Sequence, residues 1–409
     1  MRHGGDFLRA ADRGVPHFAR YLGELHRHGA GGLSSSLVHR SKDMRGKPLA
    51  RAIAFYLPQY HPVAENNEWW GEGFTEWTNT AKAKPLFRGH YQPHVPADLG
   101  FYDLRLVASR AAQADLARRY GIEGFCYYHY WFAGRRILER PFDEVLSSGE
   151  PDFPFCLCWA NESWSGIWHG LPNRLLIEQS YPGREDHFAH FQSLLPAFRD
   201  ERYICIGGKP VFLIYKPEHI PDLVAVLAYW REMAAEAGLP GLYLCAVQAS
   251  KGWNALEHGF DARIATPDMP GKLSFREAPM QYLRKKLRLR ARGPMVRAFN
   301  AFSRAEMSGN LRDVTLHPCL VHAWDNTPRS GRRGVVLQDA TPELFAPIMR
   351  AAVRGLQAKP PEQRLLFLKS WNEWAEGNHL EPDLKFGHGF LKVIGEALGV
   401  GRGEGERHE

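Results

Sequence analysis

Two glutamates three residues apart, Glu373 and Glu376, stand in the stretch SWNEWAEGNHLEP that runs from Ser370 to Pro382. Breaking a glycosidic bond needs an acid that protonates the departing oxygen and a second carboxylate that acts as nucleophile or base. In an extended strand this spacing points the two side chains to opposite sides, but a turn can bring both into one cavity. The competing interpretation is that one glutamate only caps the next segment. We predict that Glu373 and Glu376 are the catalytic pair.

Aromatic and polar side chains stand together at five predicted strand ends, this one included. Sugar rings stack on the faces of Trp and Tyr, and sugar hydroxyls need planar polar partners. Any single member could cap the core or fasten a turn, but the repeated pattern favours a carbohydrate site. We expect substrate contacts from Tyr56, Trp69, Trp70, Glu72, Trp77, Tyr127, Tyr128, His129, Trp131, Trp159, Asn161, Glu162, Trp164, Trp324, Asp325, Asn326, Arg329, Trp371, Asn372, Trp374 and Glu381.

Eight nearly continuous apolar runs must position these side chains. They lie at residues 53–57, 123–130, 153–160, 210–215, 242–247, 262–266, 318–324 and 365–371. Such runs are typical of parallel strands that are buried on both faces. Helical patterns lie between most of these runs, and the clearest are at residues 103–121, 221–238 and 341–357.

This alternation predicts an α/β fold, a (β/α)8 TIM barrel, with function at the C-terminal ends of the strands. A doubly wound sheet is the alternative, but no Gly-rich phosphate loop follows the first strand. The first connection, residues 58–100, is predicted as a long loop without a periodic pattern, which is typical of functional loops. It also carries Glu76 and Asn79.

The chain is predicted to divide into three parts. A polar and basic extension covers residues 1–48, the barrel covers residues 49–400, and a disordered tail covers residues 401–409. A basic helical insert is expected at about residues 270–312, where Arg284–Arg292 supplies most of the net charge of +7. The insert is either a solvated segment or a contact for an anionic membrane surface or lipid-linked glycan. No nucleic-acid recognition motif accompanies the charge, so no nucleic-acid partner is expected.

Composition bounds the compartment and the cofactors. Six cysteines, almost all in apolar runs, fit buried reduced thiols and a cytoplasmic location, with membrane association as the alternative. No run of 18 apolar residues and no N-terminal apolar signal region is found. No Walker loop, GxSxG or HExxH motif is present, and we expect no cofactor and no metal.

Four stretches carry a family resemblance: residues 53–105, WANESW (159–164), WDNTPR (324–329) and SWNEWAEGNHLEP (370–382). Together they resemble the WbsX-like proteins, bacterial proteins of surface-polysaccharide loci that are often labelled glycosyltransferases. The resemblance covers about residues 50–395. These proteins are similar in turn to glycoside hydrolase family 99, the endo-α-mannosidases and endo-α-mannanases.

The hydrolase resemblance is narrower, and it implies roles for the two glutamates. It rests on the predicted barrel and on NEWAEG followed by Glu381-Pro382. It implies that Glu376 is the general acid/base and that Glu373 deprotonates the sugar 2-hydroxyl to form a 1,2-anhydro intermediate with overall retention. Ala375 departs from the His that family 99 has at this place, which puts any contact made by that His in doubt.

Three functions follow from these observations. The first is a retaining enzyme that cleaves or transfers α-mannoside-type bonds of an oligo- or polysaccharide in bacterial surface-polysaccharide metabolism. The second is a glycosyltransferase of O-antigen or lipopolysaccharide biosynthesis. The third is a non-catalytic glycan-binding barrel.

Overall fold

The computed structural model describes residues 47–165, 175–250, 252–267, 293–306 and 313–400. Eight parallel strands form the core: β1 (Arg51–Tyr56), β2 (Ile122–His129), β5 (Phe155–Trp159), β9 (Lys209–Ile214), β10 (Tyr243–Ala246), β11 (Ala262–Ala265), β13 (Leu316–Val321) and β15 (Leu365–Lys369). Each overlaps one of the eight predicted apolar runs, so the strand predictions are confirmed.

The eight strands close into a ring. Their order is β1-β2-β5-β9-β10-β11-β13-β15, and β15 pairs with β1 to complete it. On β1, for example, Ala54 lies opposite Phe125 of β2 and Leu368 of β15, and all three are buried. Each strand therefore has a parallel neighbour on both sides, which leaves no open edge. The predicted (β/α)8 barrel is confirmed, and the doubly wound alternative is excluded.

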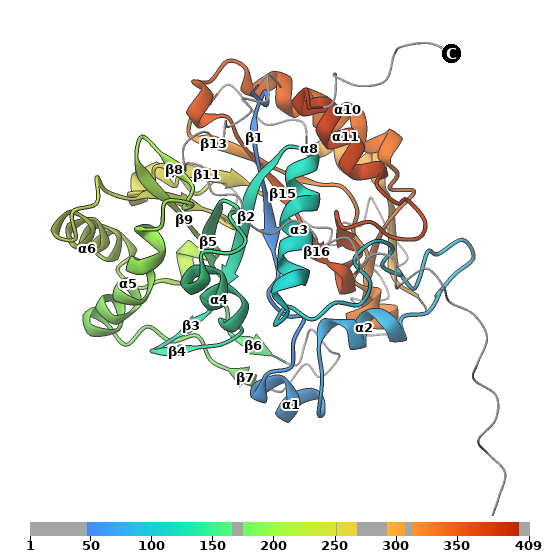
Figure 1. Ribbon diagram of the computed structural model, residues 1–409, viewed down its shortest axis with the longest axis horizontal. Helices are drawn as coiled ribbons and strands as arrows, with labels where there is room; N and C mark the ends of the chain where they lie inside the picture. Colours follow the sequence, from blue (N-terminus) through green and yellow to red (C-terminus); the bar gives the residue numbers. More distant parts are fainter. Residues whose placement is uncertain (1–46, 166–174, 251, 268–292, 307–312, 401–409) are drawn as a thin grey trace, which may run out of the picture. The chain divides into compact units, whose positions relative to one another are not determined.

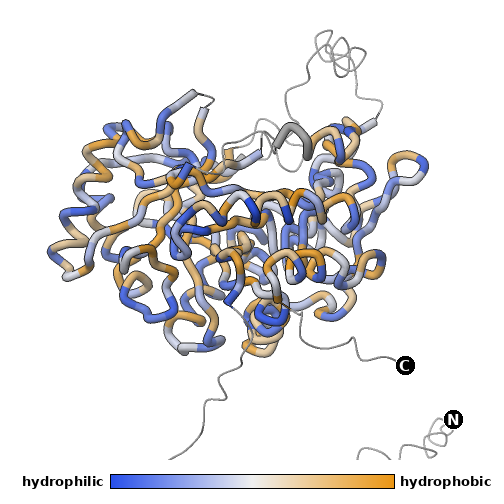
Figure 2. The backbone as a smooth tube through the Cα atoms, turned by 90° about the horizontal axis from the view of Figure 1, so that it is seen from above, coloured by the Kyte–Doolittle hydropathy of each residue, from blue (hydrophilic) through white to orange (hydrophobic). Residues whose placement is uncertain are grey.

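Helices cover the outside of the ring (Figure 1). The longer ones are α3 (Val107–Arg119), α4 (Arg140–Ser148), α5 (Arg184–Phe198), α6 (Leu223–Glu236), α10 (Pro342–Leu356) and α11 (Gly389–Leu398). In α10 the buried residues Phe345, Met349, Ala352 and Leu356 recur at helical spacing, which gives the helix one apolar face. Figure 2 shows this alternation of hydrophobic and hydrophilic positions along the helices.

Shorter elements occupy the connections. They are α1 (Ala64–Trp70), α2 (Glu76–Lys82), α9 (Thr327–Ser330), β3 (Trp131–Phe132), β4 (Arg135–Arg136), β6 (Trp164–Ser165), β7 (Leu175–Ile177), β8 (Cys205–Ile206), β14 (Val335–Gln338), β16 (Asn372–Glu373), β17 (Asn378–His379), η2 (Pro217–His219), η3 (Leu256–His258), η4 (Gly331–Arg333), η5 (Pro361–Gln363) and η6 (Trp374–Glu376). Helices α1 and α2 lie inside the first connection, so the prediction of a loop without regular structure is wrong there. Thr75 and Thr78 cap the start of α2 reciprocally.

Part of the predicted basic insert is described. Strand β12 (Met295–Ala298) pairs with β14, and α8 (Phe299–Glu306) follows it. The predicted cluster Arg284–Arg292, residues 1–46 of the extension and the tail at 401–409 lie outside the described residues. Within the described ranges, no helix has the length and apolar character needed to cross a membrane.

Candidate active site

A pocket with a cavity volume of about 150 Å³ lies at the C-terminal ends of the barrel strands. Its wall comes mainly from the ends of β1, β2, β5, β9, β13 and β15 and the connections that follow them. The lining residues are Leu57, Gln59, Trp70, Glu76, Tyr128, Tyr130, Ala160, Glu162, Ser163, Trp164, Leu176, Tyr215, Arg329, Lys369, Glu373 and Glu376. Barrels of this class carry their active sites at this face, which makes the pocket the candidate site.

Glu373 and Glu376 reach this pocket because the chain turns directly after β15. Strands β16 and β17 pair antiparallel, and η6 forms a single 3-10 turn between them. Gly377 ends that turn with a φ of +54°, and a Cβ at this position would lie 2.9 Å from the Cβ of Asp325. Glycine alone combines this backbone conformation with such a close approach. The turn therefore brings two carboxylates that are three residues apart to one cavity.

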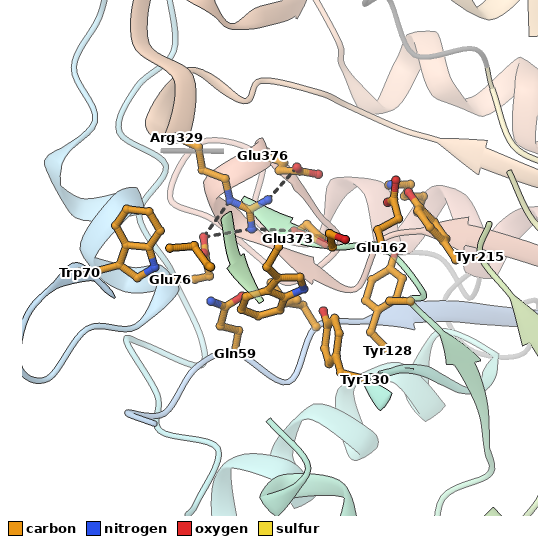
Figure 3. Close-up of a pocket in the computed structure, with 16 residues that line it drawn as sticks. Gln59, Trp70, Glu76, Tyr128, Tyr130, Glu162, Tyr215, Arg329, Glu373 and Glu376 are labelled. Carbon is orange, nitrogen blue, oxygen red and sulfur yellow. Dashed lines mark hydrogen bonds and ion pairs between the residues drawn. The ribbon is translucent and has the colours of Figure 1, made fainter. Parts of the chain in front are cut away.

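Arg329 lies among the carboxylates of the pocket (Figure 3). Its Nη1 donates to Glu376 Oε1 at 2.7 Å, and its Nη2 donates to Glu373 Oε2 at 3.1 Å. Its Nε donates to Glu76 Oε2 at 3.1 Å, and Nη2 lies 3.0 Å from the same oxygen. Because the guanidinium is planar and rigid, it holds the three carboxylates in a fixed arrangement.

Burial and neighbouring charges shift the pKa values of Glu373 and Lys369. Glu373 and Glu376 are only 6% and 5% exposed. Burial raises the pKa of Glu373 to about 7, and the charge of Glu376 adds to the rise, whereas Arg329 and Lys369 oppose it. Burial by itself lowers the pKa of Lys369, but Tyr215 and the two glutamates raise it above its ordinary value. Glu373 can therefore gain or lose a proton near neutral pH while two cations stay charged beside it.

Aromatic side chains form much of the remaining wall. Trp70, Trp164, Tyr128, Tyr130 and Tyr215 line the pocket. The ring of Trp164 meets that of Tyr130 edge-on, with centroids 5.2 Å apart. Figure 3 shows Trp70 and Tyr215 on opposite sides of the carboxylate cluster. Flat aromatic faces around buried charges fit a ligand with both apolar ring faces and hydroxyl groups.

The pocket brings together part of the predicted set: Trp70, Tyr128, Glu162, Trp164, Arg329, Glu373 and Glu376. The other predicted residues do not line it: Tyr56, Trp69, Glu72, Trp77, Tyr127, His129, Trp131, Trp159, Asn161, Trp324, Asp325, Asn326, Trp371, Asn372, Trp374 and Glu381. Two structural reasons account for most of these.

The first reason is the alternation of side chains along a strand. On β2, Tyr128 lines the pocket, whereas the ring of Tyr127 packs on Phe142 of α4. The next residue, His129, faces His190 of α5, with 2.9 Å between their Nε2 atoms. Sequence reasoning placed the whole run at the site, although adjacent strand positions face opposite sides of the sheet.

Several tryptophans at strand ends pack into the core and do not reach the pocket. Trp159 and Trp371 are fully buried, and Trp371 packs on Phe125 of β2. Trp131 stacks on His190 and donates from Nε1 to Asp186. A large apolar ring directly at a strand end is stabilised as much by packing as by a ligand. Other aromatics of the predicted set pack alike: Tyr56 on Tyr127, Trp77 on Tyr60, Trp324 under Lys369 and Trp69 on Trp164.

The second reason is that polar side chains hold the loops of the site in place. Asn372 accepts from the Leu57 amide at 2.7 Å and donates to the Leu57 carbonyl at 3.0 Å, which joins the end of β1 to β16. Asn161 binds Lys216 in the same way, from both ends of its amide. Such residues position the wall of the pocket without lining it.

Further polar residues of the predicted set also form hydrogen bonds with neighbouring segments of the chain. Asp325 accepts from His90 and Gln92, and Asn326 accepts from the amide of Val335. Glu72, which is exposed, accepts from Asn67.

Glu381 is buried and does not line the pocket. Its carboxylate accepts from Trp374 Nε1 at 2.6 Å, from Gln113 Nε2 at 2.6 Å and from the Tyr102 hydroxyl at 2.8 Å. Burial raises the pKa of Glu381 to about 7, and these hydrogen bonds oppose the rise. The side chain ties the glutamate-bearing turn to α3 and to the first connection.

The pocket also contains polar and aromatic side chains outside the predicted set of contacts: Gln59, Glu76, Tyr130, Tyr215 and Lys369. Tyr215 and Lys369 stand at or directly after the C-terminal ends of β9 and β15, so a strict strand-end rule would have found them. Glu76 stands in the predicted functional loop, but only the folding of the first connection distinguishes it from Glu72. Among the described residues, the side chains that come close enough to share a metal ion are His94, His379 and Asp383, and none of them lines this pocket.

Comparison with known sequences places the chain in a described group. A family model described as Glycosyltransferase WbsX matches residues 52–394. Two curated relatives named Uncharacterized protein WxcX, from two strains of Xanthomonas campestris pv. campestris, are 37% identical over 350 residues. Each match covers 85% of this chain and 50% of the relative, so the chain spans about half the length of these relatives.

Comparison with solved structures concerns the fold. A glycoside hydrolase-like protein aligns with a TM-score of 0.52 at 16% identity, over 87% of this chain and 95% of that one. The GH99 endo-alpha-mannosidase from Bacteroides thetaiotaomicron aligns with a TM-score of 0.50 at 12% identity, over 85% of this chain and 96% of that one. Identities this low support a shared barrel architecture and do not by themselves transfer an activity.

Proposed function

The chain belongs to the WbsX glycosyltransferase family, and we propose that it is a carbohydrate-active enzyme that cleaves or transfers α-mannoside-type bonds with retention. The observation that carries the proposal is the pair Glu373 and Glu376, both buried, both in one pocket and both bound to Arg329. A buried carboxyl group with a raised pKa in a cleft, as Glu373 has, favours catalysis over simple glycan binding.

In the proposed first step, Glu373 removes the proton from the sugar 2-hydroxyl. The 2-oxygen then attacks the anomeric carbon, the bond to the leaving oxygen breaks, and Glu376 gives that oxygen a proton. The product is a 1,2-anhydro sugar. In the second step, water or an acceptor hydroxyl attacks the anomeric carbon and opens the three-membered anhydro ring. Glu376 takes the proton of the attacking water or hydroxyl, and Glu373 returns a proton to the 2-oxygen.

Two features of the pocket support these roles. A general base works best with a pKa near the operating pH, and burial raises the pKa of Glu373 to about 7. Arg329 fixes both carboxylates, so each can stay in reach of its proton without a large change of side-chain conformation. Because no carboxylate attacks carbon on this route, the separation rule for glycosidases does not diagnose it.

Transfer to a sugar acceptor is the second candidate function, and the family description favours it. The same two carboxylates can deliver the intermediate to a hydroxyl other than water, which would suit synthesis of an O-antigen or lipopolysaccharide. A transferase that uses a nucleotide-sugar donor would instead bind that donor and tolerate loss of the glutamates.

The test is Glu376→Gln assayed with an activated α-mannoside and mannan-type oligosaccharides. Loss of a general acid should lower turnover by about 10²–10⁴-fold, while calorimetry still detects oligosaccharide binding. Glu72→Gln is the matched control, because Glu72 is exposed and outside the pocket. Undiminished turnover by Glu376→Gln would remove this residue from the mechanism.

A substrate without the 2-hydroxyl tests the intermediate separately. A 2-deoxy substrate should not be turned over, because Glu373 would have no proton to remove and no oxygen could attack the anomeric carbon. Normal turnover of this compound would rule out the anhydro route. Transfer from a nucleotide sugar that survives in a Glu373→Gln/Glu376→Gln double variant would establish the nucleotide-sugar transferase instead.

A further inference from the structure

Three buried side chains outside the pocket converge around a small cavity. His94 Nδ1 lies 2.7 Å from His379 Nε2, and Asp383 Oδ2 lies 4.0 Å and 3.9 Å from these two nitrogens. The residues belong to three segments: the first connection, β17 and the loop after β17. The cavity beside them measures about 20 Å³, which is room for about one water molecule.

The hydrogen bonds around His379 fix how this ring faces the cluster. Its Nδ1 lies 2.9 Å from the carbonyl oxygen of Glu381, so Nδ1 carries a proton and donates it. In the neutral ring, Nε2 then presents a lone pair toward His94 and Asp383. A backbone carbonyl behind a ring nitrogen is the usual support of a histidine that ligates a metal.

The carboxylate of Asp383 is also oriented from behind. Its Oδ1 accepts from the amides of Lys385 and Phe386 at 2.9 Å and 2.6 Å, which leaves Oδ2 toward the histidines. At 3.9–4.0 Å, Oδ2 is too far from either ring nitrogen for a hydrogen bond. The hydroxyl of Tyr91 is a further polar partner of this carboxyl group.

Backbone pairing holds the ligand-bearing segments together independently of these side chains. The Ala97 amide donates to the Pro382 carbonyl at 2.9 Å, and the Leu384 amide donates to the Val95 carbonyl at 3.0 Å. His379 is fixed by the pairing of β17 with β16, where it lies opposite Asn372. The cluster is therefore preformed rather than assembled by flexible side chains.

We propose that His94 Nδ1, His379 Nε2 and Asp383 Oδ2 bind one divalent transition-metal ion, with zinc as the preferred ion. Ligand atoms 2.0–2.2 Å from a tetrahedral zinc lie about 3.3 Å apart. The three observed separations bracket that value, so an ion at the centre needs shifts of only about half an ångström. His94 would carry its proton on Nε2 in this state.

The ligand set decides the class of ion. Two imidazoles and one carboxylate suit zinc and neighbouring first-row ions, whereas magnesium and calcium prefer oxygen ligands throughout. The fourth position faces the small cavity, where a water molecule completes the coordination. His322 also lines this cavity. Its Nε2 forms a hydrogen bond with the carbonyl oxygen of His379, so His322 supports the site and does not add a ligand.

The ion would link the segment after β1 to the turn that carries Glu373 and Glu376. His379 lies three residues after Glu376, and His94 lies in the segment that also supplies His90 and Gln92 to Asp325. Binding of the ion should raise the thermal stability of the protein and hold the turn in a more fixed position. This inference does not depend on the proposed activity.

The experiment uses the full chain with any purification tag removed. After dialysis against a chelator, zinc is added and measured by calorimetry and elemental analysis. We expect about one equivalent per chain, and a thermal transition that falls with chelator and returns with zinc. Cobalt in place of zinc should give the visible absorption of a tetrahedral nitrogen and oxygen site.

His94→Gln and Asp383→Asn are the test variants, and His258→Gln is the matched control at a histidine far along the chain on η3. Each test variant should bind zinc at least about tenfold more weakly, and its thermal transition should no longer respond to zinc or chelator. The control should behave as the wild type. If the wild type binds none of zinc, cobalt, nickel or manganese, or if both test variants retain full zinc binding, the pair of histidines is a plain hydrogen bond and the proposal fails.

Discussion

Arg329 of α9 and Glu76 of α2 form an ion pair of 3.0 Å inside the pocket, where their side chains are only 11% and 2% exposed. The pair joins the connection after β13 to the connection after β1, so it crosses the mouth of the barrel. Arg329 also binds Glu373 and Glu376. One guanidinium thus links the proposed catalytic pair to a third carboxylate from a distant part of the chain.

Removal of this guanidinium should be strongly destabilising. Arg329→Met leaves three buried carboxylates without their partner, and we expect the free energy of unfolding at pH 7 to fall by about 3–5 kcal/mol. The loss should shrink as pH falls, because protonation relieves the repulsion. Urea denaturation at pH 5 and pH 7 measures both effects, with Arg332→Met on the exposed neighbour as control. Equal stability of Arg329→Met and wild type at pH 7 would contradict the cluster.

The pH dependence of turnover should report Glu373. Burial raises the pKa of this carboxyl to about 7, and a general base acts in its ionised form. We therefore expect kcat/KM to rise about tenfold per pH unit as pH approaches 7 from below, and to fall at higher pH where Glu376 loses the proton that it must donate. A profile that only falls as pH rises through 7, with no rising limb, would instead make Glu373 the acid and reverse the roles of the two glutamates.

Trp70 should contribute directly to ligand binding, because it lines the pocket and its neighbour Trp69 does not. Trp70→Ala should weaken oligosaccharide binding about tenfold, which corresponds to about 1.4 kcal/mol, through loss of a stacking surface. Trp69→Ala is the matched comparison and should weaken binding less. Calorimetric titration of both variants with the same oligosaccharide decides the order, and equal losses would argue against a specific role for Trp70.

Asn372 should contribute to stability rather than to substrate contact. Its side chain is fully buried and satisfies both the amide and the carbonyl of Leu57. Asn372→Ala leaves these two buried groups without that partner, and we expect about 2–6 kcal/mol of destabilisation at about 1–3 kcal/mol for each group. Denaturant unfolding checks this value, with Asn254→Ala at an exposed position as control. A change below about 0.5 kcal/mol would show that water replaces the amide.

Sequence patterns were most reliable for the barrel itself. A strand buried on both faces must be apolar along its whole length, so the runs at 53–57 and 365–371 identify β1 and β15 without any knowledge of their partners. The pocket-lining members of the predicted set, such as Arg329 and Trp164, were found because the C-terminal ends of parallel strands converge on one face.

Sequence patterns could not separate the two faces of a strand end. Tyr127, Tyr128 and His129 are adjacent and chemically similar, yet only Tyr128 lines the pocket. The choice depends on the register of β2 against β1 and β5, which long-range pairing sets. The same limit applies to Glu72 and Glu76, since the orientation of α2 brings only Glu76 to Arg329.

By itself, the sequence determined that the chain forms eight buried parallel strands and that a turn with two glutamates follows the last of them, because both features depend on local residue order. The tertiary structure alone decided which side chains meet. Arg329 reaches Glu76 across 253 positions, and His94 reaches His379 across 285. Contacts of this kind depend on barrel closure, and no spacing along the chain encodes them.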